Sequence, residues 1–131
     1  AQEVAFAAKS EDFAWEIMEL FGIAHLSKRH PHSLSEGQKR RVSIAAVAAS
    51  QPELLLLDEP TVGQDGEGLR TLLHALNHLH TRTGSTIVTV THDRRCASAM
   101  CDRAAWLKEG RIEKTGGPEL IEAVWGDSAA M

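Results

Sequence analysis

The chain has 131 residues and a formal net charge of −4 at pH 7. This length suits one domain with a core of its own, although it is short for a doubly wound α/β enzyme. The acidic balance argues against a nucleic-acid-binding surface, which normally carries a basic excess, and no apolar run approaches the roughly 18 residues of a membrane helix. Cys96 and Cys101 have no second pair to complete a metal site, so we expect reduced, cytoplasmic thiols.

The first part of the chain predicts two helices. Ser10, which is followed by two acidic residues, has the pattern of a helix cap, and apolar residues then recur at helical spacing up to Gly22. We therefore expect an amphipathic helix over residues 10–22. After a polar loop, Ser35 and Gln38 have the spacing of a capping box, and a second helix should begin near Glu36.

A strand is expected next. Four leucines at 54–57 run directly into Asp58, Glu59 and Pro60. Such an unbroken apolar run is typical of a parallel sheet that is covered on both faces. Ligands bind at the carboxyl ends of strands in these sheets, where both acids would lie. A buried strand that ends in a solvated acidic turn would look the same, so these residues alone leave both interpretations open.

The remaining segments alternate between helices and strands. A leucine stripe predicts a third helix that ends at Gly84, and residues 85–92 form the next strand. A short helix is expected over 93–101. Residues 104–116 have the pattern of two strands joined at Glu109-Gly110, and Pro118 opens a last helix. This order of elements predicts an α/β fold.

Three segments carry a family resemblance: LSEGQKRR at 34–41, LLLLDEPTVGQD at 54–65 and TVTHD at 89–93. They resemble the signature motif, the Walker B motif with its D-loop, and the switch-histidine loop of an ATP-binding-cassette (ABC) ATPase. The resemblance covers nearly the whole chain. EVAF at residues 3–6 and the segment HPHSLSEGQKRRVSIA further resemble the energy-coupling-factor and cobalt-type importers of prokaryotes.

The resemblance implies a partial P-loop NTPase domain. Residues 1–50 would form the helical subdomain with the signature motif. Residues 51–131 would form the C-terminal part of the ATPase core, with parallel strands and a C-terminal hairpin but without the Walker A strand.

The resemblance also implies roles at the end of the leucine strand. Asp58 would hold Mg²⁺, Glu59 would polarise the attacking water, and His92 would contact the γ-phosphate of ATP. Two acids are then needed because ATP hydrolysis depends on positioning and charge stabilisation, one acid serving the metal and the other the water.

The signature segment and the D-loop would complete a site shared by two paired ATPase domains. A helix N-terminus offers unpaired N–H groups and a partial positive charge to a phosphate. Ser35 would add a hydroxyl, Gly37 would allow close approach, and Gln38 would either close the cap or reach the ribose. Asp65 would lie at the interface between the two domains.

Several residues depart from the family pattern or allow another interpretation. Glu36 replaces a usual glycine, and in the D-loop Gln64 replaces a usual leucine and Gly66 a common proline. An ordinary capping box remains the alternative for residues 35–38. His74 and His78, on one helix face with Glu67, have ligand-like spacing, although a solvated polar face is far more common.

The phosphate-binding G-x-x-x-x-G-K-[ST] loop is absent, since no glycine in the 131 residues precedes a lysine. The family's glutamine loop is absent too. We therefore expect the C-terminal portion of a longer ATPase domain, unable to bind or hydrolyse ATP by itself. We also expect either a partner chain or a rearranged hairpin to cover the edge of strand 85–92.

The predicted function is that of an ATP-hydrolysing subunit that powers import of a small solute, a metal ion or vitamin, across the prokaryotic membrane. The chain would lie peripherally at the cytoplasmic face of the cell membrane. Its partners would be a second ATPase subunit and a transmembrane coupling subunit, with no nucleic acid. Two alternatives stay open: a non-transport relative in DNA repair, chromosome maintenance or translation, and an inert interaction module. The acidic charge disfavours the first of these.

Overall fold

A computed structural model describes residues 11–129 of the chain and the side chains of residues 11–126. The chain divides into two compact units, one that ends at Val90 and one that begins at Thr91. The predicted boundary between residues 50 and 51 differs from this division, because it was placed on family motifs, and it stays a prediction. The cap expected at Ser10 and the EVAF segment lie outside the described residues.

Three helices of the first unit match the sequence prediction closely: α2 (Glu11–Leu20), α3 (Glu36–Ala48) and α4 (Gly66–Thr83). The helix α2 ends two residues earlier than expected, and Gly22 follows it with a φ of 68°. The segment predicted only as a polar loop contains a single turn of 3-10 helix, η2 (Pro31–Ser33), and a second such turn, η1 (Ala24–Leu26), precedes it.

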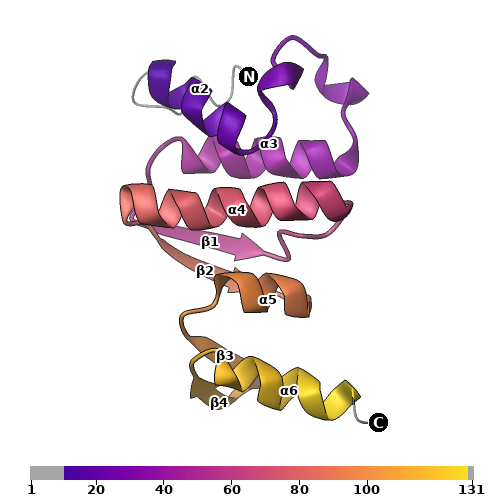
Figure 1. The fold of residues 1–131 in the computed structure, drawn as a ribbon, viewed down its shortest axis with the longest axis vertical. Helices are drawn as coiled ribbons and strands as arrows, with labels where there is room; N and C mark the ends of the chain where they lie inside the picture. Colours follow the sequence, from indigo (N-terminus) through magenta and orange to yellow (C-terminus); the bar gives the residue numbers. More distant parts are fainter. Residues whose placement is uncertain (1–10, 130–131) are drawn as a thin grey trace. The chain divides into compact units, whose positions relative to one another are not determined.

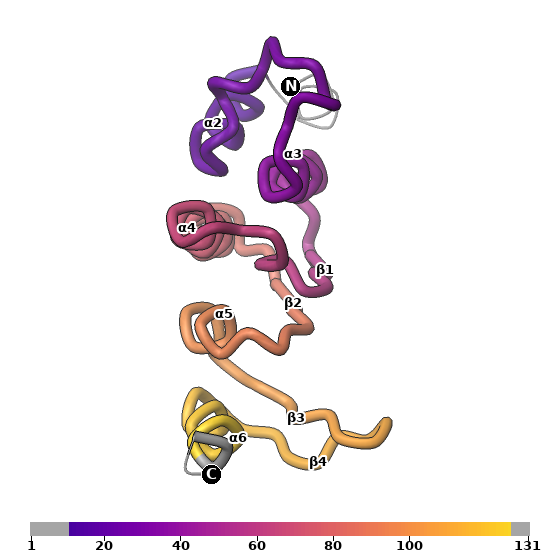
Figure 2. The backbone as a smooth tube through the Cα atoms, turned by 90° about the vertical axis from the view of Figure 1, so that its right-hand side faces the viewer, coloured from indigo at the N-terminus to yellow at the C-terminus, as the bar shows by residue number. Residues whose placement is uncertain are grey.

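The two predicted strands of this unit form a parallel pair. The strand β1 (Leu54–Asp58) pairs with β2 (Thr86–Val90), with Leu56 opposite Val88 and Asp58 opposite Val90. Figures 1 and 2 both show α3 and α4 side by side, on the same side of this strand pair. A parallel pair needs a crossover between its strands, and α4 provides it.

The core of the first unit lies among its helices and one face of its strands. On α4 the predicted leucine stripe is buried except for Leu73, which is half-buried, and Leu55 and Leu57 are buried on β1. The helix α2 contributes Ile17, and Phe21 follows it; both are almost completely buried.

The other face of the strand pair is exposed. Leu54 and Leu56 are 52% and 68% exposed, and Val88 and Val90 are 49% and 60% exposed. The expectation that both faces of β1 are covered is therefore wrong for this chain. The physical reason is that α3 and α4 lie on one side of the pair, and only alternate residues of β1 reach them.

The second unit is a hairpin with two helices. It contains α5 (Arg94–Met100), β3 (Ala104–Lys108), β4 (Arg111–Gly116) and α6 (Glu119–Ala129). The strands β3 and β4 are antiparallel and joined at Glu109-Gly110, as predicted, and α6 lies against them with Leu120 and Ile121 buried (Figure 1).

Within residues 11–129 the strands form two separate sheets, because β1 pairs with β2 and β3 pairs with β4. Among the described residues only β1 pairs with β2, so the expected rearranged hairpin at that edge is wrong, while the other expected alternative, a partner chain, stays a prediction. The fold class is the predicted one, a mixed α/β structure with parallel strands and a C-terminal antiparallel hairpin. Cys96 and Cys101 are both free thiols, and Cys96 is buried. None of the described helices is long and apolar enough to span a membrane.

Candidate functional site

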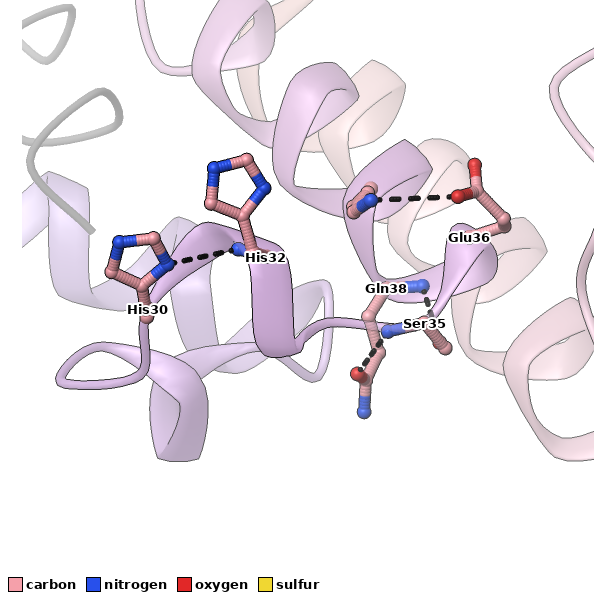
Figure 3. Close-up of polar contacts among 6 residues, drawn as sticks. His30, His32, Ser35, Glu36 and Gln38 are labelled. Atoms are coloured by element: carbon pink, nitrogen blue, oxygen red, sulfur yellow. Dashed lines mark hydrogen bonds and ion pairs between the residues drawn. The ribbon is translucent and has the colours of Figure 1, made fainter.

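The start of α3 is a complete capping box. The Ser35 hydroxyl oxygen accepts a hydrogen bond from the Gln38 backbone N–H at 3.1 Å, and the Gln38 side-chain oxygen accepts one from the Ser35 N–H at 2.9 Å (Figure 3). Gln38 therefore closes the cap, one of the two roles expected for it, and its contact with a ribose stays a prediction. This box fixes the direction in which the first turn of α3 begins.

The negative charge of Glu36, which replaces a usual glycine, is directed to solvent. Its side chain is 86% exposed and forms an ion pair with Lys39 at 3.4 Å. An exposed pair one helical turn apart contributes little to stability. Its relevance is electrostatic, because Lys39 offsets the carboxylate next to the predicted anion-binding helix start.

The two acids of the predicted catalytic segment lie where β1 ends. Asp58 is the exposed last residue of the strand, and the Glu59 backbone N–H donates to the Val90 carbonyl oxygen at 2.7 Å. Glu59 has a φ of 48°, which is unusual for a residue with a side chain. Such conformations cost free energy and cluster at functional sites.

Asp65 begins the helix that follows this loop. It is the N-cap residue of α4, and its Oδ1 accepts a hydrogen bond from the Gly68 backbone N–H at 2.7 Å. Asp65 therefore has a structural role within its own chain, whether or not it also lies at an interface between subunits.

Two hydrogen bonds join α3 to the end of β1 and to the loop after it. The Arg40 Nη1 donates to the Asp58 carbonyl oxygen at 3.3 Å, and the Gln64 Nε2 donates to the Gly37 carbonyl oxygen at 2.9 Å. From the sequence, Gln64 was noted only as a departure from a family pattern and Arg40 only as part of the segment LSEGQKRR, and neither contact was predicted. A polar residue at a usually apolar position was the one available signal.

The structure thus brings Ser35, Gly37 and Gln38 close to the segment from Asp58 to Asp65 within the first unit. His92 belongs to the second unit and lies two residues after Val90, which is opposite Asp58 in the strand pair. The role of His92 stays a prediction.

The carboxylate of Asp58 fits a Mg²⁺ ion that binds together with a nucleotide. Residues 11–129 contain no group of three or more His, Cys, Asp or Glu side chains that could hold a metal ion by themselves. Magnesium usually binds through one or two carboxylates together with substrate phosphates and water, which Asp58 can satisfy. The same finding leaves the alternative site at His74, His78 and Glu67 without support.

Comparison with known proteins identifies the family. The family model described as "ABC transporter" matches residues 1–62. The energy-coupling factor transporter ATP-binding protein EcfA2 of Bacillus licheniformis is 39% identical over 124 residues, which cover 94% of this chain and 43% of that protein. The chain belongs to the ABC transporter ATPase family.

Other relatives of this ABC ATPase chain include the sulfate/thiosulfate import ATP-binding protein CysA of Mesorhizobium japonicum, 43% identical over 108 residues, which cover 82% of this chain and 31% of CysA. The methionine import ATP-binding protein MetN of Salmonella enteritidis is 38% identical over 124 residues, which cover 88% of this chain and 39% of MetN. The chain thus spans less than half the length of these curated relatives.

Two solved structures of ABC ATPases resemble the chain in three dimensions. CbiO1 from Clostridium perfringens, part of the transporter complex CbiONQ, superposes with a TM-score of 0.74 at 34% identity, covering 95% of this chain and 52% of CbiO1. The ATP-binding cassette MJ0796, solved as a dimer bound to ADP and Pi, gives a TM-score of 0.72 at 30% identity, covering 85% of this chain and 50% of MJ0796.

Proposed function

We propose that this chain acts in the ATP-hydrolysing subunit of a prokaryotic importer for a small solute, a metal ion or a vitamin. One observation carries the proposal: Asp58 and Glu59 lie at the carboxyl end of the parallel strand β1, and hydrogen bonds join the Asp58 backbone and the following loop to α3 within the same unit. The family membership, the transporter protein EcfA2 and the import proteins CysA and MetN support the transport part of the proposal, and the solute class is the proposal's own.

In this proposal the acids have different tasks. Asp58 binds the Mg²⁺ that accompanies ATP, and the ion offsets negative charge on the phosphates. Glu59 accepts a hydrogen bond from the attacking water and thereby polarises that water. The turn at Glu59 takes the chain out of the strand direction directly after Asp58, so the two carboxylates need not follow strand alternation.

The start of α3 serves a nucleotide held mainly by a second ATPase subunit. Ser35 and the first-turn N–H groups, including that of Gly37, offer donors and a partial positive charge to its phosphate. The dimer of MJ0796 bound to ADP and Pi supports such pairing. The further partner is a transmembrane coupling subunit, to which this chain binds at the cytoplasmic face of the membrane; CbiO1, part of a transporter complex, supports this.

The test is the Glu59→Gln substitution in the complete gene product that contains this chain. Turnover should fall on the order of 10²-fold or more, because a water-polarising group is lost, while Mg-ATP still binds. Glu109→Gln is the matched control, since Glu109 also has a positive φ, of 52°, but lies in the β3–β4 turn. Phosphate release by Glu59→Gln within a few-fold of wild type would contradict the assignment.

Transport is tested separately in cells. Uptake of labelled metal ions and vitamins should be lost for one solute in the Glu59→Gln strain and retained in the Glu109→Gln strain. Uptake that is equal in both strains for every solute would contradict the importer part of the proposal.

The 131-residue chain alone should neither bind Mg-ATP with useful affinity nor hydrolyse it. Without a phosphate loop, Asp58 and Glu59 present only negative charge to an anionic ligand. Calorimetric titration of the purified chain with Mg-ATP measures this directly. A micromolar dissociation constant would contradict the expectation.

A further inference from the structure

The loop between Glu59 and Asp65 lies in direct backbone contact with the start of α3. A Cβ atom placed on Gly37 would be 2.7 Å from the Gly63 carbonyl oxygen, a separation that real side chains essentially never show. Gly63 itself has a φ of 83°, which favours glycine. The two glycines therefore allow a contact that any larger residue at Gly37 would push apart.

Gln64 holds this contact from the loop side. Its Nε2 donates to the Gly37 carbonyl oxygen at 2.9 Å in a partly buried position. Its Oε1 lies against the first turn of α4, where a Cβ atom placed on Gly68 would be only 2.6 Å away. The amide thus fits between α3 and α4, and glycine on both helices leaves it the room.

The neighbouring link is weaker. Arg40 reaches the Asp58 carbonyl oxygen at 3.3 Å from an exposed position, whereas the bond from Gln64 is shorter and partly buried. Hydrogen bonds of this kind act more strongly where water competes less. Of these two hydrogen bonds, the one from Gln64 is therefore expected to hold α3 and the loop together more strongly.

We propose that Gln64 is a positioning residue that keeps the start of α3 in a fixed place relative to the loop carrying Glu59 and Asp65. This inference rests on the proposed function, in which the two segments serve different nucleotides. With Gln64 in place, a shift of Ser35 and Gly37 at one nucleotide moves the loop at the other. Without Gln64, the start of α3 and the loop that carries Glu59 and Asp65 lose their fixed relative position, and ATP turnover slows.

The first experiment uses the 131-residue chain and amide hydrogen exchange measured by NMR. Gln64→Met keeps the side-chain length but removes the donor, and Gln64→Asn keeps the amide but shortens it by one carbon. Both variants should speed exchange at the Lys39 amide, which bonds to the Ser35 carbonyl, and at the Gly68 amide by about fivefold, the factor expected from one ordinary hydrogen bond.

The amide of Leu76, in the interior of α4, is the internal reference and should be unchanged. Gln51→Met makes the same chemical change in the segment before β1 and should leave all three amides as in wild type. Unchanged exchange at Lys39 and Gly68, or an equal increase at Leu76, would overturn the positioning role, because the effect would then be absent or global.

The second experiment measures ATP turnover in the complete gene product. Gln64→Met should lower kcat about fivefold and leave KM for Mg-ATP within about twofold, since no contact with a bound nucleotide is removed. If Glu59→Gln abolishes turnover while Gln64→Met matches wild type, the positioning role fails and the proposed function stands. If Glu59→Gln itself retains turnover, the proposed function fails.

Discussion

Glu59 offers a way to separate backbone strain from chemistry. With a φ of 48° it occupies the left-handed region, which costs a residue with a Cβ about 1–2 kcal/mol. Glycine removes this cost but loses about 0.4–1 kcal/mol through the greater freedom of the unfolded chain. The difference between these ranges is centred at about 0.8 kcal/mol, so we expect Glu59→Gly to be more stable than Glu59→Ala by about that amount.

Comparing Glu59→Gly with Glu59→Ala isolates the backbone contribution to the free energy of unfolding, because both variants lack the carboxylate and its contacts. Both should lose turnover in the complete gene product on the order of 10²-fold or more. The more stable glycine variant would then be as inactive as the alanine variant, which is expected if the strain is retained for the position of the acid rather than for stability.

Exchange of the most protected amides provides the assay, since it reports the opening free energy of each compact unit separately. Glu109, with a φ of 52° in the β3–β4 turn, is the matched control. Its glycine and alanine variants should differ by a similar amount, but in the amides of the second unit, and should keep full turnover. A Glu59→Ala variant more stable than Glu59→Gly would refute the argument, because without backbone strain alanine is favoured by about 0.4–1 kcal/mol.

Three further predictions concern Ser35 and Glu16. Ser35→Arg should prevent the ATP-bound dimer in a hydrolysis-deficient complete gene product by filling the space above the helix N-terminus; an undiminished dimer peak in sedimentation would count against it. Ser35→Ala should destabilise the first unit by about 1 kcal/mol through loss of the cap, with no change in urea midpoint as the contrary result. The hydrogen bond from Arg82 lowers the pKa of Glu16 below its ordinary value of 4.5. This carboxylate stabilises the fold above its ordinary pKa, and the effect is lost as pH falls through the lowered value; because the pair is exposed, the change is small. Glu16→Gln should make the thermal midpoint depend less on pH at acidic pH. An unchanged dependence would show that the Glu16–Arg82 pair does not contribute to it.

Local signals in the sequence predicted the helix ends well. The capping box at Ser35 and Gln38 and the left-handed Gly84 after α4 each depend on residues within one turn, so they can be identified without the fold. The turn at Glu109-Gly110 was predictable for the same reason. The short turn η2 was missed because one turn of 3-10 helix leaves no periodic pattern.

Features set by distant contacts were not predictable. The four leucines of β1 indicate a strand, but they do not show how many of its faces this chain covers, because that depends on which layers pack against it. Gln64 and Gly37 are 27 residues apart, and no local pattern predicts their hydrogen bond. The left-handed Glu59 has no glycine or asparagine to signal it, so only the structure revealed the strain at the candidate site.

The exposed face of the strand pair affects how the purified protein can be handled. Leu54, Leu56, Val88 and Val90 form an apolar surface over two adjacent strands, and such surfaces promote self-association. A lysine in place of Leu56 would raise the concentration that stays in solution. The same lysine would weaken any layer that packs on this face, because a buried, unpaired charge is costly. At position 56, therefore, a charged residue favours solubility, whereas an apolar residue favours the packing of a further layer on this face.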